Sequence, residues 1–179
     1  MEPADHFPVL KSRNLRLRKI VPEDLDHIFI GLSHPDVIRY YGVSYSSREE
    51  THQQMKFFAD LEANETGIWW AICSIEDDTF FGAGGLNNLN KVFRKAEIGF
   101  WLLPAYWGAG LMKEGLELIC RYAFEHLHLH RIEAFVESDN DNCKRAMKKS
   151  SFVHEGTMKD CEIKNGRFIS LEIYARYGQ

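Results

Sequence analysis

Hydrophobic and polar residues alternate near the start of the chain and then follow a helical period. Leu15 and Leu17 stand between arginines, a pattern that predicts a strand with one buried face. A Pro-Glu-Asp stretch at residues 22–24 supplies residue types favoured in the first turn of a helix, and apolar residues at helical spacing follow from Leu25 to Leu32. Ser47–Glu50 has the pattern of a capping box, so a second helix is expected after it.

The middle of the chain changes to the shorter period of β-strands. Residues 68–74 and 79–86 have the composition of two strands around an acidic turn, and residues 94–103 that of a third strand. From Gly108 the period becomes helical again, with apolar residues three or four positions apart as far as Leu127. This part of the chain therefore predicts three neighbouring strands followed by a long amphipathic helix.

The last third of the chain returns to alternation. Residues 131–136 predict a strand and residues 140–149 a short helix. Two closing strands follow, and the second has apolar residues at every other position from Ile169 to Ala175. The whole order, β-α-α-β-β-β-α-β-α-β-β, predicts a mixed α/β fold in one domain spanning residues 10–177.

Composition and charge narrow the functional classes. The 179 residues are 45% hydrophobic and 27% charged, which is typical of an ordinary globular domain. Because the net charge is −4 and there is no basic run, neither direct nucleic-acid binding nor a membrane partner is expected. Residues 1–6 lack the apolar core of a signal peptide. The four cysteines form no CxxC pair, so we expect a cytoplasmic protein without a zinc site.

One junction in the chain has the pattern of an anion-binding loop. Gly108, Ala109 and Gly110 stand between a predicted strand and the long helix. Glycines there let backbone N–H groups approach a ligand closely, and the helix dipole favours a phosphate. A tight turn without a ligand would show the same pattern, so the motif alone leaves both interpretations open. It is neither a P-loop nor a dinucleotide-binding fingerprint, because residue 113 is Lys and no Lys-Ser/Thr pair follows.

Short motifs follow one another along the chain in a distinctive order. They are Ala96–Trp101, the Tyr-Trp-Gly-Ala-Gly run at Tyr106–Gly110, His130–Ala134, Asn140–Cys143 and Ser151–Phe152, with Leu15–Arg18 before them and Cys161–Gly166 and Ile173–Arg176 after them. This set resembles the GNAT superfamily of acyl-CoA N-acetyltransferases, in particular the branch of the RimJ and RimL ribosomal-protein N-terminal acetyltransferases. Each motif is weak by itself, whereas the set spans nearly the whole chain.

The resemblance implies a fold and a reaction. The expected GNAT fold has a mixed, mostly antiparallel central sheet, splayed between the fourth and fifth predicted strands (94–103 and 131–136) and flanked by about four helices. The expected reaction is direct transfer of an acetyl group from acetyl-CoA, without a metal, to a primary amine. The best-matched acceptor is the N-terminal α-amino group of a protein, such as a ribosomal protein.

Other functions remain compatible with these residues. A polyamine, an amino sugar or an amino acid is the alternative acceptor within the enzyme class. A CoA-binding module without activity, or a protein adaptor, is the alternative outside it. Three departures from the resembled branch favour the inactive module: Met147, Cys143, and Ser151 in place of the usual glycine. A homodimer is compatible with all of these functions.

The resemblance also implies which residues contact acetyl-CoA. The pantetheine arm would lie between the splayed strands, and the pyrophosphate would lie on the N–H groups of the glycine loop and the first helical turn. The basic outer face of the short helix is either a solvated surface or a contact for the 3′-phosphate. The expected coenzyme-binding residues are Phe100, Trp101, Leu102, Trp107, Gly108, Ala109, Gly110, Leu111, Met112, Asn140, Cys143, Lys144 and Met147.

Three residues are candidates for the proton transfers of the reaction. Glu162 matches a glutamate of the resembled branch and is the first candidate for the base that deprotonates the amine, with Glu97 the second. Cys143 stands where that branch carries a serine proposed to protonate the departing sulfur, and a thiol can also donate a proton. The alternatives are an exposed charge for Glu162, a structural role for Glu97, and packing or a covalent nucleophile for Cys143. Met147, where many GNAT enzymes carry a tyrosine acid, cannot donate.

Overall fold

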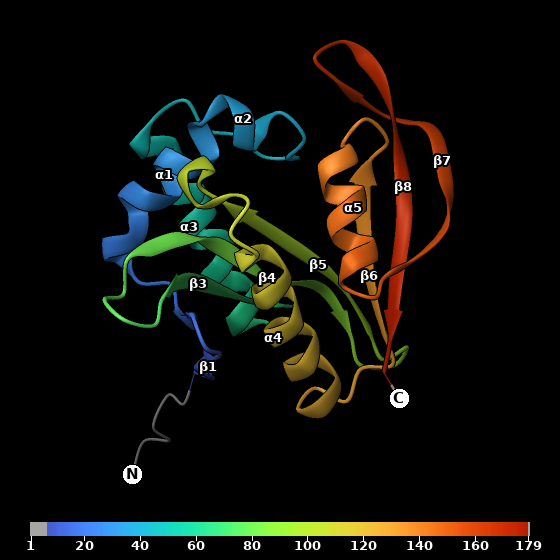
Figure 1. Ribbon diagram of the computed structural model, residues 1–179. Helices are drawn as coiled ribbons and strands as arrows, with labels where there is room; N and C mark the ends of the chain where they lie inside the picture. Colours follow the sequence, from blue (N-terminus) through green and yellow to red (C-terminus); the bar gives the residue numbers. More distant parts are fainter. Residues whose placement is uncertain (1–6, 179) are drawn as a thin grey trace.

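The computed structural model describes residues 7–178, and the chain folds around one eight-stranded sheet (Figure 1). The strands are β1 (Leu10–Lys11), β2 (Leu15–Lys19), β3 (Ile68–Ser74), β4 (Phe80–Asn90), β5 (Lys95–Leu102), β6 (Arg131–Glu137), β7 (Val153–Lys164) and β8 (Arg167–Tyr177). The helices are α1 (Leu25–Ser33), α2 (Pro35–Ile38), α3 (Arg48–Ala63), α4 (Leu111–Glu125) and α5 (Asp141–Lys149), with 3-10 turns at Pro22–Asp24 and Pro104–Tyr106.

The strands lie in the order β1-β2-β3-β4-β5-β6-β8-β7. Neighbours are antiparallel except β5 and β6, which are parallel. The expected mixed, mostly antiparallel α/β fold is therefore confirmed. The periodicity missed β1 and α2, because elements of two and four residues are too short to show a period.

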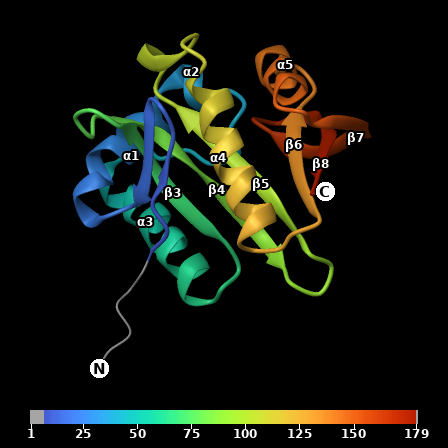
Figure 2. The same cartoon turned by 60° about the horizontal axis from the view of Figure 1, so that its bottom comes forward.

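Helices cover both faces of the sheet. Figure 2 shows α4 lying over β4 and β5, with α5 beyond it over the last strands. On β3, Trp70 and Ile72 point into the core beneath α4, whereas Trp69 and Ala71 point into a second core beneath α1 and α3. Successive side chains of a strand point to opposite faces, so a strand covered on both sides is apolar throughout.

The start of α3 follows the sequence prediction in part. The Ser47 hydroxyl accepts a hydrogen bond from the Glu50 N–H at 3.1 Å and caps the helix. The reciprocal half of a capping box would bring the Glu50 carboxylate to the Ser47 N–H. Instead that carboxylate accepts from the N–H of Ser46 at 2.9 Å and from its hydroxyl at 2.7 Å. The helix therefore begins where the motif predicts, but Glu50 bonds to Ser46, one residue before the N-cap Ser47.

Residues 1–6, for which the sequence predicts no signal peptide, lie outside the described residues. From residue 7 to residue 178, no helix is long and apolar enough to cross a membrane. The same stretch contains no group of His, Cys, Asp and Glu side chains that could hold a metal ion.

Candidate functional site

The sheet divides where β5 and β6 separate. Three residue pairs join these parallel strands, the last being Glu97 with Glu133. Beyond this pair, β5 continues to Leu102 beside β4, and β6 continues to Glu137 beside β8. The opening between the two strands, called the wedge below, is therefore edged by backbone groups with no strand partner among the described residues (Figure 2). The splay expected between these strands is confirmed.

The loop after β5 has a backbone that glycine adopts most easily. Gly108 has a φ of +80° and Gly110 a φ of +78°, and no atom lies within 4 Å of where a Cβ would stand at either residue. The helix expected from Gly108 begins only at Leu111, after this loop. The N–H groups of its first turn have no partner within the helix. Open space and free N–H groups at a positive helix end fit an anion such as a pyrophosphate.

Two side chains fix this loop. The Trp107 indole N–H donates to the Leu102 carbonyl at 2.8 Å. In the first turn of α4, Glu114 accepts a hydrogen bond from the Asn14 N–H at 2.9 Å and another from the Ser12 hydroxyl. Burial raises the pKa of Glu114, but these hydrogen bonds outweigh it and hold the pKa below its usual value. The sequence analysis did not predict that Glu114 anchors α4. An acidic residue in the first turn of a helix is a recognisable pattern and could have indicated it.

The side chains at the end of β5 point away from the wedge. Phe100 packs against Gly115 of α4, where a Cβ would come within 2.6 Å of the ring. Trp101 packs on the opposite face, against Gly31 of α1. Leu102 is buried in the core beneath α4. These residues therefore border the wedge through their backbone and not through their side chains.

The candidate residues at α5 have two kinds of contact. Some form hydrogen bonds that fix the start of the helix, and others pack in the core. The Asn140 side-chain oxygen accepts from the Cys143 N–H at 3.1 Å and caps the helix. The Lys144 ammonium donates to the Ser138 carbonyl at 2.6 Å. Met147 is 4% exposed and packs in the core shared with α4. Cys143 packs against the same core and keeps part of its surface exposed.

The environment of Cys143 keeps its thiol protonated. Burial raises the pKa of this thiol to about 11. At neutral pH the group is therefore an S–H, and it releases its proton less readily than an ordinary thiol does. A thiol is a much weaker nucleophile than a thiolate, so this environment disfavours the covalent alternative.

The sheet separates the candidate bases from the candidate acid. Glu97 lies four residues before Trp101 on β5, and therefore on the same face, the one that α1 and α3 cover. Glu162 of β7 pairs with Ile169 of β8, and alternation along β8 and β6 places it on that face too. Cys143 belongs to α5 on the opposite face. An amine would thus reach the wedge from the α1 side of the sheet. A thiolate would leave the wedge on the opposite side, toward α5.

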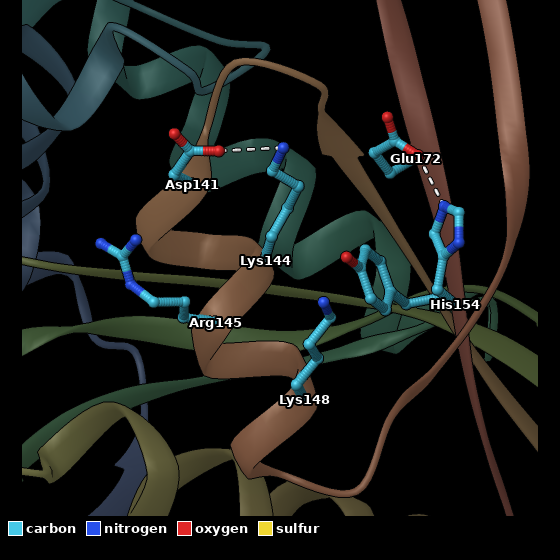
Figure 3. A pocket seen from close by; sticks show the side chains of 7 residues that line it. Asp141, Lys144, Arg145, Lys148, His154 and Glu172 are labelled. Carbon is cyan, nitrogen blue, oxygen red and sulfur yellow. Dashed lines mark hydrogen bonds and ion pairs between the residues drawn. The ribbon is translucent and has the colours of Figure 1, made fainter.

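A pocket of about 370 Å³ lies between α5 and the two last strands (Figure 3). In Figure 3 the ammonium of Lys144 points to Asp141, and the His154 ring points to Glu172. The lining residues are Asp141, Lys144, Arg145 and Lys148 of α5, His154 of β7, and Glu172 and Tyr174 of β8.

The charges in this pocket leave an excess of positive charge. Glu172 accepts hydrogen bonds from Thr157 at 2.6 Å, Ser138 at 2.8 Å and His154 at 2.6 Å. These bonds lower its pKa to about 2, so the carboxylate is ionised and fully engaged. The Lys148 ammonium has no hydrogen-bonding or ionic partner among residues 7–178. A pocket with this balance favours an anion such as a phosphate.

Comparison with known proteins yields one family. The model of the family described as Acetyltransferase (GNAT) domain matches residues 14–153. The uncharacterized N-acetyltransferase YoaA of Bacillus subtilis is 32% identical over 170 residues, which cover 94% of this chain and 96% of that protein.

Two solved structures share the fold at lower identity. One is the acetyltransferase that modifies the N-terminal serine of ribosomal protein L7/L12 in Salmonella typhimurium, with a TM-score of 0.86 and 22% identity over 96% of this chain and all of that one. The other is the spermidine N-acetyltransferase of Vibrio cholerae in complex with CoA and spermine, with a TM-score of 0.82 and 20% identity over 93% of this chain and 96% of that one.

Proposed function

This chain belongs to the acetyltransferase (GNAT) family and is an N-acetyltransferase, and from that premise we propose that it acetylates the N-terminal α-amino group of a protein. The observation that carries the proposal is the wedge between β5 and β6, which leads to the glycine loop before α4. The fold neighbour from Salmonella typhimurium, which modifies an N-terminal serine, supports the choice of acceptor.

Residues on both sides of the wedge would bind acetyl-CoA. The pantetheine arm would hydrogen-bond to the free backbone edges of β5 and β6, much as an added strand does. Asn140 would order the turn beside the arm. The 3′-phosphate would lie against Lys144 and Lys148 in the pocket of α5. The pyrophosphate would lie on the backbone N–H groups of Gly108, Ala109, Gly110, Leu111 and Met112. The Trp107 N–H is not free for this contact, because it donates to the Pro104 carbonyl at 3.1 Å.

The reaction forms an N–C bond to the acetyl carbon and breaks its C–S bond. Glu162, or Glu97 in its place, takes the proton from the amine. A backbone N–H near Trp101 or Leu102 donates to the carbonyl oxygen as it gains negative charge. Cys143 gives its thiol proton to the departing sulfur. Exchange with solvent then returns a proton to Cys143 and removes the one held by the glutamate. Charge therefore never accumulates on the amine or on the leaving group.

An α-amino group suits this arrangement better than a lysine side chain. Its ordinary pKa is near 8, against about 10.4 for lysine, so a far larger fraction is already neutral at pH 7. A carboxylate then needs to remove only the proton that the amine loses during attack. The four free cysteines, Cys73, Cys120, Cys143 and Cys161, fit the reducing cytoplasm that we propose as its compartment.

A competition assay read by mass spectrometry tests the proposal. The protein and acetyl-CoA are mixed with peptides that have Ala, Ser or Met N-termini, with blocked peptides that contain lysine, and with polyamines, amino sugars and amino acids. We expect acetylation of free peptide N-termini. Acetylation of a small amine alone would keep the enzyme and reject the protein acceptor. Binding of CoA without any acetylation would favour an inactive module instead.

A further inference from the structure

The tip of the β7–β8 hairpin projects from the sheet toward α2 (Figure 1). Three residues lie between Met158 and Glu162 on β7, whereas only one residue lies between their partners Leu171 and Ile169 on β8. Such an irregularity bends a strand and redirects the side chains that follow it. Apolar packing contributes little to holding the tip, because the cross-strand pair Ile163 and Phe168 is 68% exposed at both residues.

One lysine side chain connects this tip to the rest of the molecule. The Lys164 ammonium donates to a Glu137 carboxylate oxygen at 2.8 Å and to the Arg39 carbonyl at 2.7 Å. The side chains of Lys164 and Glu137 are only 24% and 12% exposed, so water screens their ion pair less than it would at an open surface. We call these two contacts the Lys164 bridge.

The Lys164 bridge spans the wedge. Glu137 is the last residue of β6 and belongs to the side formed by β6, β8 and β7. Arg39 follows α2 and belongs to the side formed by the strands up to β5. At its narrow end the wedge is closed by the β5–β6 pairs, and the Lys164 bridge therefore joins the same two sides at a second place.

The candidate base lies on the same short stretch of strand. Glu162 stands two residues before Lys164 on β7, so both side chains point to the same face of the hairpin. That face is the one from which the acceptor amine would approach. A carboxylate at the end of a bent hairpin takes part in proton transfer efficiently only if the hairpin tip is held in place.

We propose that Lys164 is a positioning residue, whose contacts with Glu137 and Arg39 hold the hairpin tip so that Glu162 faces the acceptor amine. This inference rests on the proposed function, because it assigns Glu162 the role of the base. Lys164 itself touches neither substrate. Its effect on the reaction therefore passes entirely through the placement of Glu162.

Four single variants and one double variant test this assignment. Lys164→Met removes the ammonium and keeps most of the aliphatic stem, whereas Lys164→Arg keeps a cation and its donors. Lys159→Met is the matched control, because Lys159 is an exposed lysine of the same strand. Glu162→Gln, alone and combined with Lys164→Met, completes a double-mutant cycle. The readouts are kcat and KM for the acceptor peptide and for acetyl-CoA, together with amide hydrogen exchange of residues 159–169.

We expect Lys164→Met to lower kcat about tenfold, with the KM for acetyl-CoA changed by less than about twofold. Exchange in the hairpin tip should rise, and Lys164→Arg should recover most of both losses. In the Glu162→Gln background, Lys164→Met should cause no further loss of kcat. Lys159→Met should match the wild type throughout.

Three results would overturn the assignment. They are a wild-type kcat in Lys164→Met, an equal loss of kcat in the Glu162→Gln background, and unchanged hydrogen exchange in the tip.

The activity of the wild-type protein distinguishes a failure of this inference from a failure of the proposed function. If the wild type acetylates no peptide, the proposed function fails and the role of Lys164 toward Glu162 fails with it. If the wild type is active and Lys164→Met behaves like it, only the inference fails.

Discussion

The two sides of the wedge are stabilised by different interactions. On the side formed by the strands up to β5, helices cover both faces of the sheet, and Trp70, Ile72 and Leu86 have no exposed surface. On the side formed by β6, β8 and β7, α5 covers one face, and β7 is exposed along most of its length. Apolar burial therefore dominates the first side, called the apolar side below.

Charged hydrogen bonds dominate the second side, called the charged side below. Arg131 donates to Glu133 at 2.8 Å, to Glu155 at 2.9 Å and to the Tyr177 hydroxyl at 2.6 Å. Glu172 and the Lys164 bridge add similar contacts along the same strands. The site thus lies between a side that depends on packing and a side that depends on charge. Changes in pH should act mainly on the charged side.

The largest effect is expected from a truncation on the apolar side. Trp70 is fully buried, donates to the Pro8 carbonyl at 2.8 Å and packs edge-on against Tyr122. Trp70→Ala should lower the free energy of unfolding by about 3–5 kcal/mol. Urea denaturation measures this change.

The matched control for Trp70→Ala lies on the charged side. Phe168→Ala removes another large aromatic ring, but one that is 68% exposed. We expect the free energy of unfolding to change by no more than about 0.5 kcal/mol. Similar losses in both variants would contradict the contrast between the two sides.

Acid should loosen the charged side before the apolar side. Hydrogen bonds led by that from Arg131 lower the pKa of Glu155 to about 2, and those led by Thr157 lower the pKa of Glu172 to about 2. Both values lie below the ordinary 4.5, so these carboxylates contribute stability that is fully present above about pH 4.5 and is lost as the pH falls toward 2.

Two probes separate the sides in this acid titration. All four tryptophans, at positions 69, 70, 101 and 107, lie on the apolar side, so fluorescence reports that side. Hydrogen exchange of β7 and β8, corrected for intrinsic rates, reports the charged side. Exchange should rise at a higher pH than the fluorescence changes. A single transition seen by both probes would show that the two sides unfold together.

The glycine loop should tolerate a methyl group poorly. Gly110 has a φ of +78°, a backbone conformation that costs an L residue about 1–2 kcal/mol. Gly110→Ala should therefore raise the Kd for CoA about tenfold, as measured by calorimetry. Gly42→Ala is the control, because a Cβ there meets nothing within 4 Å and the φ is not positive. Equal CoA affinities in the two variants would remove the loop from the binding site.

The smallest effect is expected in the pocket of α5. Lys148 lines that pocket, whereas its neighbour Lys149 does not. Lys148→Ala should raise the Kd for CoA about threefold, the loss typical of one exposed charge pair. The Kd for 3′-dephospho-CoA should stay the same, and Lys149→Ala should change neither value. An equal loss for both coenzymes in Lys148→Ala would place the 3′-phosphate elsewhere.

Local patterns predicted much of the fold. The alternation of Leu15 and Leu17 between arginines corresponds to β2, with both leucines fully buried. The helical period after Gly108 corresponds to α4, apart from a start that is displaced to Leu111. The displacement follows from the left-handed backbone at Gly110, which a helix cannot continue through. Such features depend on residues a few positions apart, which is why a single sequence reveals them.

Contacts between distant segments could not be predicted in this way. Glu114 meets Ser12 across 102 residues, and Lys164 meets Arg39 across 125 residues. No sequence motif around Lys164 predicts its contact with Arg39. The hydrogen bonds that lower the pKa of Glu172 likewise come from two other segments, at Ser138 and at Thr157.

The sequence by itself determined the order of elements, the position of the glycine loop and the family to which the chain belongs, because periodicity, glycine conformation and short motifs are encoded by neighbouring residues. The tertiary structure decided that Glu97 and Glu162 share one face of the sheet, that Cys143 lies on the other, and that burial raises the pKa of the Cys143 thiol. It also decided the Lys164 bridge. Faces, burial and pKa values depend on which distant segments pack together, and no local pattern carries that information.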